Sequence, residues 1–204
     1  YNFSGDMVLT NLTVSGSRDG NVSNAGGTLT INGGLLNKCK DKSVSVGGGK
    51  AVVTDVTIAG TTGEKYGVYV YGGELYMQDC DIKDVSSTAV KLDAGAYAEL
   101  KNVAMKDIAQ NGIQTDGGRI VATEISMENI GSHGLYNNKG NIVVDGATID
   151  AVAKNMLQNK EGSTYLSGIK ADNIGNHGAY IDRGTVTVAD STLKNMSSNG
   201  FYFI

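Results

Sequence analysis

The sequence of 204 residues contains no proline and no tryptophan, and it has only two cysteines and two histidines. Two cysteines, Cys39 and Cys80, exclude a disulfide framework and a four-cysteine zinc site, so we expect both to be small core residues. Without proline, no residue interrupts the backbone hydrogen-bond donors that extended strands need. These absences favour long hydrogen-bonded strands that depend neither on cross-links nor on zinc.

The sequence also lacks an excess of positive charge and long hydrophobic runs. Lysine and arginine total 17 against 21 aspartate and glutamate residues, a net charge of −4, and there is no basic run, so we expect no nucleic-acid partner. No apolar stretch approaches the roughly 18 residues of a membrane span, and no charged-then-apolar leader is present. We therefore expect no membrane span in this segment, and any export signal to lie upstream or to have been removed.

Glycine, by contrast, is abundant, with 29 residues, and it helps to mark an internal repeat. The segments NIGSHGLY (129–136) and NIGNHGAY (173–180) place His133 and His177 44 residues apart, which is twice 22. This period continues through the whole chain, with steps of 22 to 24 residues. The first inward position of each repeat, called +0, is Met7, Leu29, Ala51, Leu75, Ala98, Ile120, Ile142, Thr164 and Val186.

Each repeat contains apolar residues in short alternating bursts, at positions +0, +2, +5, +7, +10 and +15. Alternation with a period of two is typical of strands that bury one face. We therefore expect three short strands in each repeat, separated by three turns, with the polar residues between the apolar ones facing outward. In one repeat the apolar set is Ile120, Ala122, Ile125, Met127, Ile130 and Leu135.

Two further positions carry turn residues. Asp or Asn occupies +9 in five repeats, and both residue types tolerate a left-handed backbone. Glycine occupies +14 in five repeats and adopts positive φ without a steric penalty. We expect turns at Asp84, Asp107, Asn129, Asn173 and Asn195, and again at Gly67, Gly112, Gly134, Gly178 and Gly200.

A 22-residue repeat cannot bury its apolar face alone, but stacked repeats bury one continuous column. The pattern predicts an all-β parallel β-helix, a solenoid of about nine three-strand coils of 22–24 residues. At about 4.8 Å per coil, the rod is roughly 43 Å long. Left-handed hexapeptide helices have coils of about 18 residues, so the coil size favours the right-handed form. We expect residues 1–204 to form a single solenoid that is a fragment of a longer rod.

Three places stand out from the regular repeat. Two extra residues fall within GTTGEK, Gly60 to Lys65, and one within DAGAY, Asp93 to Tyr97, so we expect small loops there. At +17, Asn137 and Asn159 are expected to stack directly inside a turn as an amide ladder that bonds each coil to the next. Such a ladder predicts added stability and says nothing about a ligand.

The two histidines occupy +13, a column that exchanges His with Asn and Thr along the chain. Such a column is better explained as a repeat position than as a catalytic pair. Two coils also separate the histidines by about 9.6 Å, whereas proton transfer needs contact within about 3 Å. We therefore expect no catalytic residues. The column reads Tyr66, Thr88, Asn111, His133, Asn155, His177 and Asn199.

Two motif-like stretches do not change this interpretation. VGGGKA (46–51) lacks the first glycine and the hydroxyl of a phosphate-binding loop, since Val44 and Ala51 stand in those places. Aspartates cluster at 79, 81 and 84, but no calcium-binding nonapeptide occurs. We expect neither a metal site nor a cofactor.

The 22-residue coils, the Asn and Gly turns, the near absence of cysteine and the lack of long loops resemble the β-helical passenger regions of autotransporters and related bacterial surface adhesins. Pectin-lyase-like enzymes share this fold, so the fold alone does not decide the function. Their motifs are not matched: SHG and NHG agree with Gly-His-Gly in two residues only, no Asp-Asp pair occurs, and Arg18, Arg119 and Arg183 fall in different positions of different coils. The resemblance implies an extracellular location on a bacterial cell surface.

We therefore expect a surface-displayed stalk or adhesin without catalysis. The alternative is a glycan-binding or glycan-cleaving β-helix of the tailspike or polysaccharide-lyase type. Expected partners are host or bacterial surface proteins or glycans, and open strand edges favour end-to-end self-association. The expected binding surface combines +13 and +16, where outward tyrosines lie beside His and Asn, although stacked tyrosines can also simply brace neighbouring strands. Its residues are Tyr136, Tyr180, Tyr202, His133, His177 and Asn199.

Overall fold

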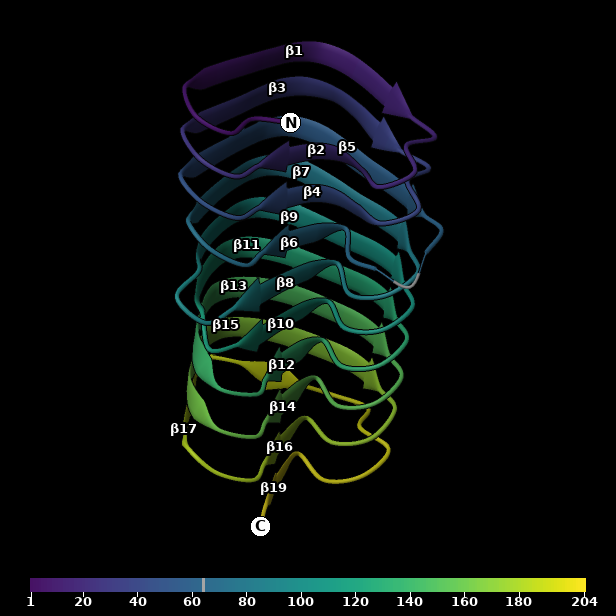
Figure 1. The fold of residues 1–204 in the computed structure, drawn as a ribbon. Helices are drawn as coiled ribbons and strands as arrows, with labels where there is room; N and C mark the ends of the chain where they lie inside the picture. Colours follow the sequence, from purple (N-terminus) through teal and green to yellow (C-terminus); the bar gives the residue numbers. More distant parts are fainter. Residues whose placement is uncertain (64) are drawn as a thin grey trace.

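The computed structural model describes residues 1–63 and 65–204, and these residues form strands and turns. Two series of strands alternate along the chain (Figure 1). The first series is β1 (Asp6–Ser15), β3 (Thr28–Asn37), β5 (Lys50–Thr61), β7 (Glu74–Val85), β9 (Tyr97–Ile108), β11 (Arg119–Ile130), β13 (Gly140–Val152), β15 (Gly162–Ile174), β17 (Thr185–Ala189) and β18 (Thr192–Leu193). The second is β2 (Gly20–Asn24), β4 (Lys42–Val46), β6 (Val68–Val70), β8 (Val90–Asp93), β10 (Ile113–Asp116), β12 (Leu135–Asn137), β14 (Leu157–Asn159), β16 (Ala179–Ile181) and β19 (Phe201–Phe203).

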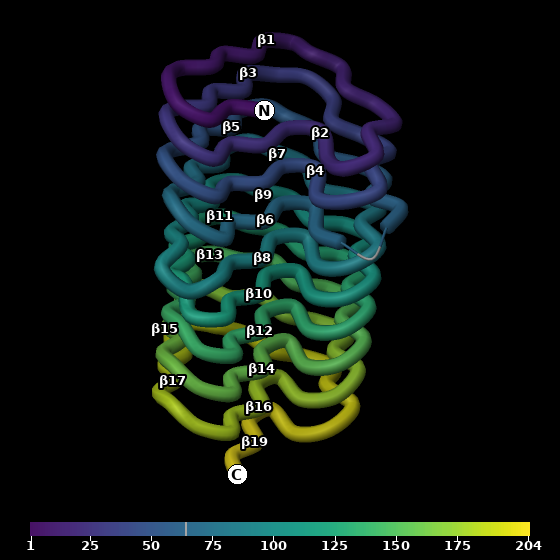
Figure 2. Tube along the Cα trace, viewed as in Figure 1, coloured from purple at the N-terminus to yellow at the C-terminus, as the bar shows by residue number. Residues whose placement is uncertain are grey.

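Each series forms one parallel sheet. The long-strand sheet has the order β1-β3-β5-β7-β9-β11-β13-β15-β17, with β18 also paired to β15. The short-strand sheet has the order β19-β16-β14-β12-β10-β8-β6-β4-β2. Because each strand pairs with its counterparts one coil before and one coil after, the described chain winds into a stack of nine coils (Figure 1, Figure 2).

The strand register confirms the repeat and its first irregularity. Ile120 pairs with Ile142, and Asn37 pairs with Ala59, in both cases 22 residues apart. The offset rises to 24 where Val44 pairs with Val68. The two extra residues therefore lie before Val68, as predicted from the GTTGEK segment. Glu64, which belongs to that segment, lies outside the described residues.

The second irregularity is confirmed in the same way. Val70 pairs with Leu92 at an offset of 22, whereas Glu74 pairs with Tyr97 at an offset of 23. The single extra residue therefore lies between Leu92 and Tyr97, in the predicted DAGAY segment. Beyond this point the long strands pair at 22 residues from each coil to the next.

The predicted core is confirmed. All six apolar positions of the repeat that begins at Ile120 are at most 2% exposed, and outward Glu128 is exposed. Cys39 and Cys80 are buried free thiols, as expected. Full burial of a large aliphatic side chain stabilises by about 1.5–3 kcal/mol. The stacked apolar columns are therefore the main force that holds the coils together.

Left-handed residues form the corners of each coil. The predicted +9 turns are confirmed, with φ between 50° and 57° at Asp84, Asp107, Asn129, Asn173 and Asn195. A second left-handed residue, not foreseen, occupies +4, as at Asp79, Asn102 and Glu124. It bends the strand without ending its pairing. The first two of the three predicted strands therefore join into one bent strand in the coils from β1 to β15, whereas β17 and β18 stay separate in the last coil.

The expectation of a left-handed backbone at the +14 glycines is wrong. A positive φ is not found at Gly67, Gly112, Gly134, Gly178 or Gly200. Glycine is needed there for space: a Cβ on Gly134 would lie 2.8 Å from the carbonyl oxygen of Met156 in the next coil. A Cβ on Gly67 would lie equally close, 2.8 Å, to the carbonyl oxygen of Ala89. These glycines permit close stacking of coils rather than a special turn.

The predicted ladder at +17 is correct in position and wrong in bonding. Asn137 and Asn159 are fully buried and pair across neighbouring coils. Asn137 Nδ2 donates to Thr164 Oγ1 at 3.0 Å, and Thr164 Oγ1 donates to Asn159 Oδ1 at 2.8 Å, so a hydroxyl links the two amides. A direct hydrogen bond between two side-chain amides occurs at the same position near the N-terminus, where Asn2 Nδ2 donates to Asn24 Oδ1 at 2.8 Å.

Candidate binding face

The outer side of the short-strand sheet carries two neighbouring columns of side chains, +13 and +16, which we call the binding face. The +16 side chains stand in the short strands, and the strand register aligns them from coil to coil. All six residues predicted for the site lie in these two columns. The +16 column is Ser23, Ser45, Tyr69, Lys91, Gln114, Tyr136, Gln158, Tyr180 and Tyr202.

The +13 column forms a ladder of hydrogen bonds between coils. The backbone N–H of His133 donates to Asn111 Oδ1 at 3.2 Å, and the N–H of Asn155 donates to His133 Nδ1 at 3.4 Å. The pattern continues at 3.1 Å and 3.2 Å, where the N–H groups of His177 and Asn199 donate to the side chain one coil earlier. Asn and His exchange here because Oδ1 and Nδ1 are acceptors three bonds from Cα. The geometry therefore supports the repeat interpretation of the histidines.

The ladder also bears on the charge of His133. Because Nδ1 accepts a hydrogen bond, the neutral ring carries its proton on Nε2. Burial, together with the positive charges of Lys154 and Lys160, lowers the pKa of His133 to about 4. His133 is therefore neutral at pH 7.

In the four coils from Asn111 to Tyr180 the +13 side chain contacts the +16 side chain of its own coil, and the kind of contact alternates. In a histidine coil two rings meet, with 5.6 Å between the ring centroids of His133 and Tyr136. In the next coil two amides meet, and Asn155 Nδ2 donates to Gln158 Oε1 at 2.8 Å. Between Asn111 and Tyr180 the face therefore alternates amide pairs with ring pairs.

Three rings gather at the C-terminal end of the face. The ring centroids of Tyr180 and Tyr202 are 5.2 Å apart and stacked, and the ring centroid of His177 lies 5.0 Å from that of Tyr202. His177 is 9% exposed, whereas Asn199 is exposed. Tyr136 is two coils from Tyr180, and the predicted stacking of tyrosines on adjacent coils therefore holds for Tyr180 and Tyr202 only.

A charged cluster, not foreseen from the sequence, occupies the middle of the face. The side chain of Lys91 is only 5% exposed, and its Nζ pairs with Asp93 at 2.9 Å and also with Asp116. The Tyr69 hydroxyl donates to the other carboxylate oxygen of Asp93. Gln114 Nε2 donates to Asp116 at 3.3 Å. The cluster thus joins side chains from three consecutive coils.

The contacts within the cluster hold Lys91, Tyr69 and Asp93 in their ordinary charge states. Burial opposes the charge on Lys91, but Asp116 and Asp93 outweigh burial and raise the Lys91 pKa. Burial and the hydrogen bond to Asp93 raise the pKa of Tyr69. Burial disfavours the Asp93 carboxylate, but the hydrogen bonds from Tyr69 and Lys91 outweigh it and lower the Asp93 pKa. At neutral pH Lys91 is charged and Tyr69 keeps its proton, so neither is ready to accept a proton.

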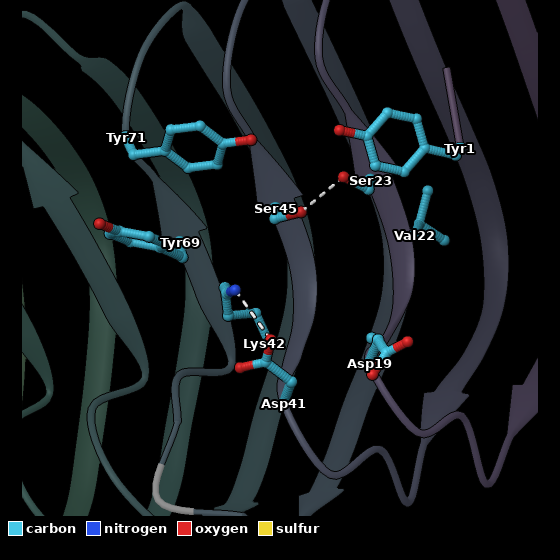
Figure 3. A pocket seen from close by; sticks show the side chains of 10 residues that line it. Tyr1, Asp19, Val22, Ser23, Asp41, Lys42, Ser45, Tyr69 and Tyr71 are labelled. Carbon is cyan, nitrogen blue, oxygen red and sulfur yellow. Dashed lines mark hydrogen bonds and ion pairs between the residues drawn. The ribbon is translucent and has the colours of Figure 1, made fainter. Parts of the chain in front are cut away.

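Beside the charged cluster the face is hollowed into a pocket of about 450 Å³ (Figure 3). Its floor is low because Ser23 and Ser45 stand at +16, and Ser45 Oγ donates to Ser23 Oγ at 2.9 Å. Tyr1 and Tyr71 lie on opposite sides of this serine pair (Figure 3). The lining residues are Tyr1, Asp19, Gly20, Val22, Ser23, Asp41, Lys42, Ser45, Tyr69 and Tyr71.

One wall of this pocket is aromatic and closely packed. The Tyr71 ring lies directly against the backbone at Gly47, where an added Cβ would overlap the ring. Its centroid is 5.3 Å from that of Tyr69. Lys42 Nζ lies 5.9 Å from the Tyr69 ring centroid and pairs with Asp41 at 2.8 Å. The wall therefore presents rings whose positions are set by their neighbours.

The sequence-based site covers the C-terminal coils and misses this pocket. A usable signal exists in the sequence, because Ser23 and Ser45 precede Tyr69 at the repeat spacing. Small residues followed by a tyrosine in one outward column predict a hollow beside an aromatic wall. The charged cluster is harder to foresee, since Asp93 and Asp116 stand in a different column from Lys91.

Outside the binding face, the described residues form weaker candidates for a functional site. A second depression, of about 480 Å³, lies on the long-strand sheet, and its lining of Thr, Asp, Asn, Lys, Ile and Ala contains no aromatic ring. Within residues 1–63 and 65–204, no group of three or more His, Cys, Asp or Glu side chains is arranged to hold a metal ion. In the same ranges, no helix has the length and hydrophobicity that crossing a bilayer requires.

A family model described as a right handed beta helix region matches residues 66–204. The matched range contains all six residues predicted for the site and the charged cluster. It also confirms the right-handed form predicted from the coil size. A comparison with curated protein sequences gives no match.

Two solved structures share the fold at low sequence identity, and a third is less similar. Tailspike protein 2 of the Escherichia coli O157:H7 bacteriophage CAB120 aligns with a TM-score of 0.56 and 12% identity over 95% of this chain, which spans only 35% of the tailspike. An alginate lyase from Paenibacillus sp. str. FPU-7 aligns with a TM-score of 0.51 and 11% identity, over 96% of this chain and 92% of the lyase. The Streptococcus pneumoniae surface protein and adhesin PfbA reaches a TM-score of 0.34 at 8% identity, over 98% of this chain and 91% of PfbA.

Proposed function

The chain belongs to the family of right-handed β-helix regions, and on that premise we propose that it is an adhesive rod that binds glycans or proteins through the binding face without catalysis. Fold alone does not decide between adhesion and catalysis, because the same fold carries both. The proposal therefore rests on the side chains of this face.

The observation that carries the proposal is the alternation of amide pairs and ring pairs between Asn111 and Tyr180 on the short-strand sheet. Tyr136 packs on His133, and Tyr180 packs on both His177 and Tyr202. Such rings offer apolar area and hydroxyl groups to a partner. Because their neighbours already restrict them, little further side-chain entropy is lost on binding. This favours recognition of an extended partner that lies along the rod.

The charge states on the face support binding rather than acid–base chemistry. A general base works best with a pKa near the working pH. The pKa of His133 lies well below that range, while Lys91 and Tyr69 have pKa values raised above their usual ranges. These shifts move the three groups away from proton transfer at neutral pH.

The proposed setting is the outside of a bacterial cell. The coil length, the Asn and Gly corners and the scarcity of cysteine support a passenger region of the autotransporter type, displayed as a stalk. The proposed partners are surface proteins or glycans of the host or of other bacteria. End-to-end association with further copies belongs to the same proposal, because the outermost strands of a sheet can pair with another chain.

The test of the binding function is a double substitution, Tyr136→Ser with Tyr180→Ser. We expect binding to cells or to a glycan array to weaken by about tenfold or more, as when aromatic anchors are removed from an interface. Thermal unfolding of the variant is measured first to show that the coils are intact. Tyr165→Ser is the matched control, since Tyr165 is 44% exposed on the long-strand sheet. Full binding by the double variant would refute a role for this part of the face.

Glycan cleavage is the second candidate, and the buried Lys91 between two carboxylates is the observation that favours it. Wild type and Lys91→Met are incubated with the glycans that the wild type binds, and new reducing ends and unsaturated products are measured. Cleavage by the wild type that disappears in Lys91→Met would replace the adhesive function with an enzymatic one. A His133→Ala variant that alone loses cleavage would place the chemistry at +13 instead.

A further inference from the structure

We propose that the pocket between Tyr1 and Tyr71 is a subsite for an uncharged pyranose ring of a neutral glycan, and that it disfavours uronate sugars. This inference rests on the proposed function, because it names the ligand class for one part of the same face. It differs from the predicted site in place, since it concerns the N-terminal coils.

The pocket has the surfaces that a sugar ring needs. Its volume of about 450 Å³ lies within the range of about 300–1,000 Å³ that is usual for small-ligand sites. Tyr71 is 42% exposed, so its ring is available to the C–H face of a pyranose. The Tyr69 ring beside it extends the same wall, and Tyr1 faces it across the floor (Figure 3).

The floor supplies polar groups that match sugar hydroxyls. Ser45 donates its hydroxyl hydrogen to Ser23. The Ser23 hydrogen and the Ser45 lone pairs are then available, so the pair can both donate to and accept from a hydroxyl of the ligand. Serine side chains lose little entropy when they are fixed, unlike lysine or arginine. A neutral ring is therefore bound by its apolar face on one side and by its hydroxyls below.

The charges argue against an acidic sugar. Three charged side chains line the pocket: Asp19, Asp41 and Lys42. Lys42 is paired with Asp41 at 2.8 Å, and Asp19 adds a further negative charge. Among the side chains that line the pocket, the one cation, Lys42, is therefore already paired, and a uronate carboxylate also meets two carboxylates. Unpaired like charges are a common means of rejecting a ligand.

The neighbouring cluster reinforces this preference. Lys91 is engaged by both Asp93 and Asp116. A polyuronate that extended from the pocket along the face would reach two more carboxylates, whose one buried cation is already shared. A neutral chain meets no such repulsion and can use the free acceptor positions of these carboxylates for its hydroxyl hydrogens.

The experiment measures binding of the full 204-residue chain to defined hexasaccharides by isothermal titration calorimetry. The neutral probes are the hexamers of glucose, mannose and N-acetylglucosamine, and the acidic probes are the hexamers of alginate and polygalacturonate. We expect at least one neutral hexamer to bind at least tenfold more tightly than either acidic hexamer. We expect Tyr71→Ser to weaken that binding at least fivefold, with Tyr165→Ser unchanged.

Gly47→Ala sharpens the test, because it moves the Tyr71 ring without removing it. The affected neighbour is a partly exposed side chain, so we expect the variant to fold and to bind at least threefold more weakly. Thermal unfolding of each variant is compared with that of the wild type. If Gly47→Ala unfolds, Tyr71→Ser still decides the outcome, because an exposed ring contributes little to the core.

Three results would overturn the subsite: no binding of any neutral hexamer, tighter binding of an acidic hexamer, or wild-type affinity in Tyr71→Ser. These results leave the proposed function standing if the Tyr136 and Tyr180 double variant still loses its cell or array binding. If the wild-type chain binds no cell surface and no array glycan, the proposed function itself fails.

Discussion

The binding face is built differently in its two halves. From residue 98 onward the coils pair at offsets of 22 residues, and the +13 ladder runs without a break from Asn111 to Asn199. Before residue 98 two coils carry extra residues, and the face holds the pocket and the Tyr69, Lys91 and Asp93 part of the charged cluster, which reaches Asp116 in the next coil. The uniform half produces an even surface of ring and amide pairs. The interrupted half, which is the part before residue 98, carries the pocket and most of the charged cluster.

The difference shows which part of a repeat protein can vary from coil to coil. Inside the solenoid both halves contain buried aliphatic columns, whose members in the first and last coils are only partly buried. Outside, the two-residue departure precedes Tyr69 on one wall of the pocket, and the one-residue departure adjoins Asp93 in the charged cluster. The core thus specifies the coil, while the outer columns are free to specify a ligand.

The largest expected effect tests whether the halves share one core. Ile130→Ala in the uniform half and Ile58→Ala in the interrupted half are each expected to lower the free energy of unfolding by about 2–5 kcal/mol, from lost burial and the remaining cavity. Both side chains are at most 1% exposed. Urea titrations monitored by circular dichroism give the values. Glu128→Ala, outward in the coil of Ile130, is the control, with a change of about 0.5 kcal/mol or less.

A much smaller loss at Ile58 than at Ile130 would break the contrast, because the halves would then differ inside as well as outside. Equal losses at Ile130 and Glu128 would contradict the assigned register itself.

A second prediction tests the close stacking of the uniform half. Gly134→Ala is expected to cost about 1–3 kcal/mol, because the new Cβ must push against the Met156 carbonyl group. Gly146→Asn is the control: Gly146 has φ of 73° and occupies +4, where other coils carry Asn or Asp. We expect it to cost less than about 1 kcal/mol. A smaller loss at Gly134→Ala than at Gly146→Asn would contradict the need for close stacking at +14.

A third prediction concerns pH and the +13 ladder. The unfolded chain binds a proton at His133 below about pH 6.5, whereas the folded chain does so only below a pKa of about 4. The unfolded state therefore binds more protons in this window, and the contribution of His133 to stability is present above pH 6.5 and is lost as the pH falls toward 4. We expect a loss of about 1–2 kcal/mol, reduced from the full shift by partial exposure.

The matched variant for this pH effect is His133→Asn, which keeps an acceptor in the ladder and removes the titration. Unfolding free energies of both proteins are measured at pH 7 and pH 4. A parallel fall in the two proteins would assign the pH effect to other groups.

The smallest expected effect separates the acceptor from the residue type. Asn155→Ala removes the acceptor for the backbone N–H of His177 and is expected to cost about 1 kcal/mol or somewhat more. Asn155→His with Gln158→Tyr keeps an acceptor and converts an amide pair into a ring pair. We expect this double variant to be more stable than Asn155→Ala in the same thermal unfolding experiment. If it is less stable, the alternation of pairs is fixed by packing rather than by the ladder.

The fold could be predicted because the 22-residue period is a property of buried residues. Apolar columns at fixed spacing determine the register, and the register determines which residues share a face. For that reason Ile130 and Tyr136 were placed correctly. The merging of two strands at +4 was not foreseen, because a residue such as Glu124 gives no composition signal of a left-handed backbone.

The candidate site was predictable only in its regular half. The repeat identifies His133 and His177 in the sequence as members of one column. The pocket, in contrast, depends on how Tyr71 lies against Gly47. Glycine itself is ambiguous in a sequence, since it serves both positive φ and close approach, and at +14 the second reason applies. Likewise the link between Asn137 and Asn159 passes through Thr164, which the alternating pattern marks only as an inward residue.

The +13 ladder allows residues on the outer face of this rod to be substituted while its hydrogen bonds are kept. One substitution exchanges an asparagine for a histidine, and a second, three residues later, supplies a tyrosine in place of a glutamine. With either residue at +13, the backbone N–H one coil later keeps a side-chain acceptor. A lineage, or a protein designer, can therefore rewrite the outer face one coil at a time, and place rings at chosen multiples of about 4.8 Å on an unchanged scaffold.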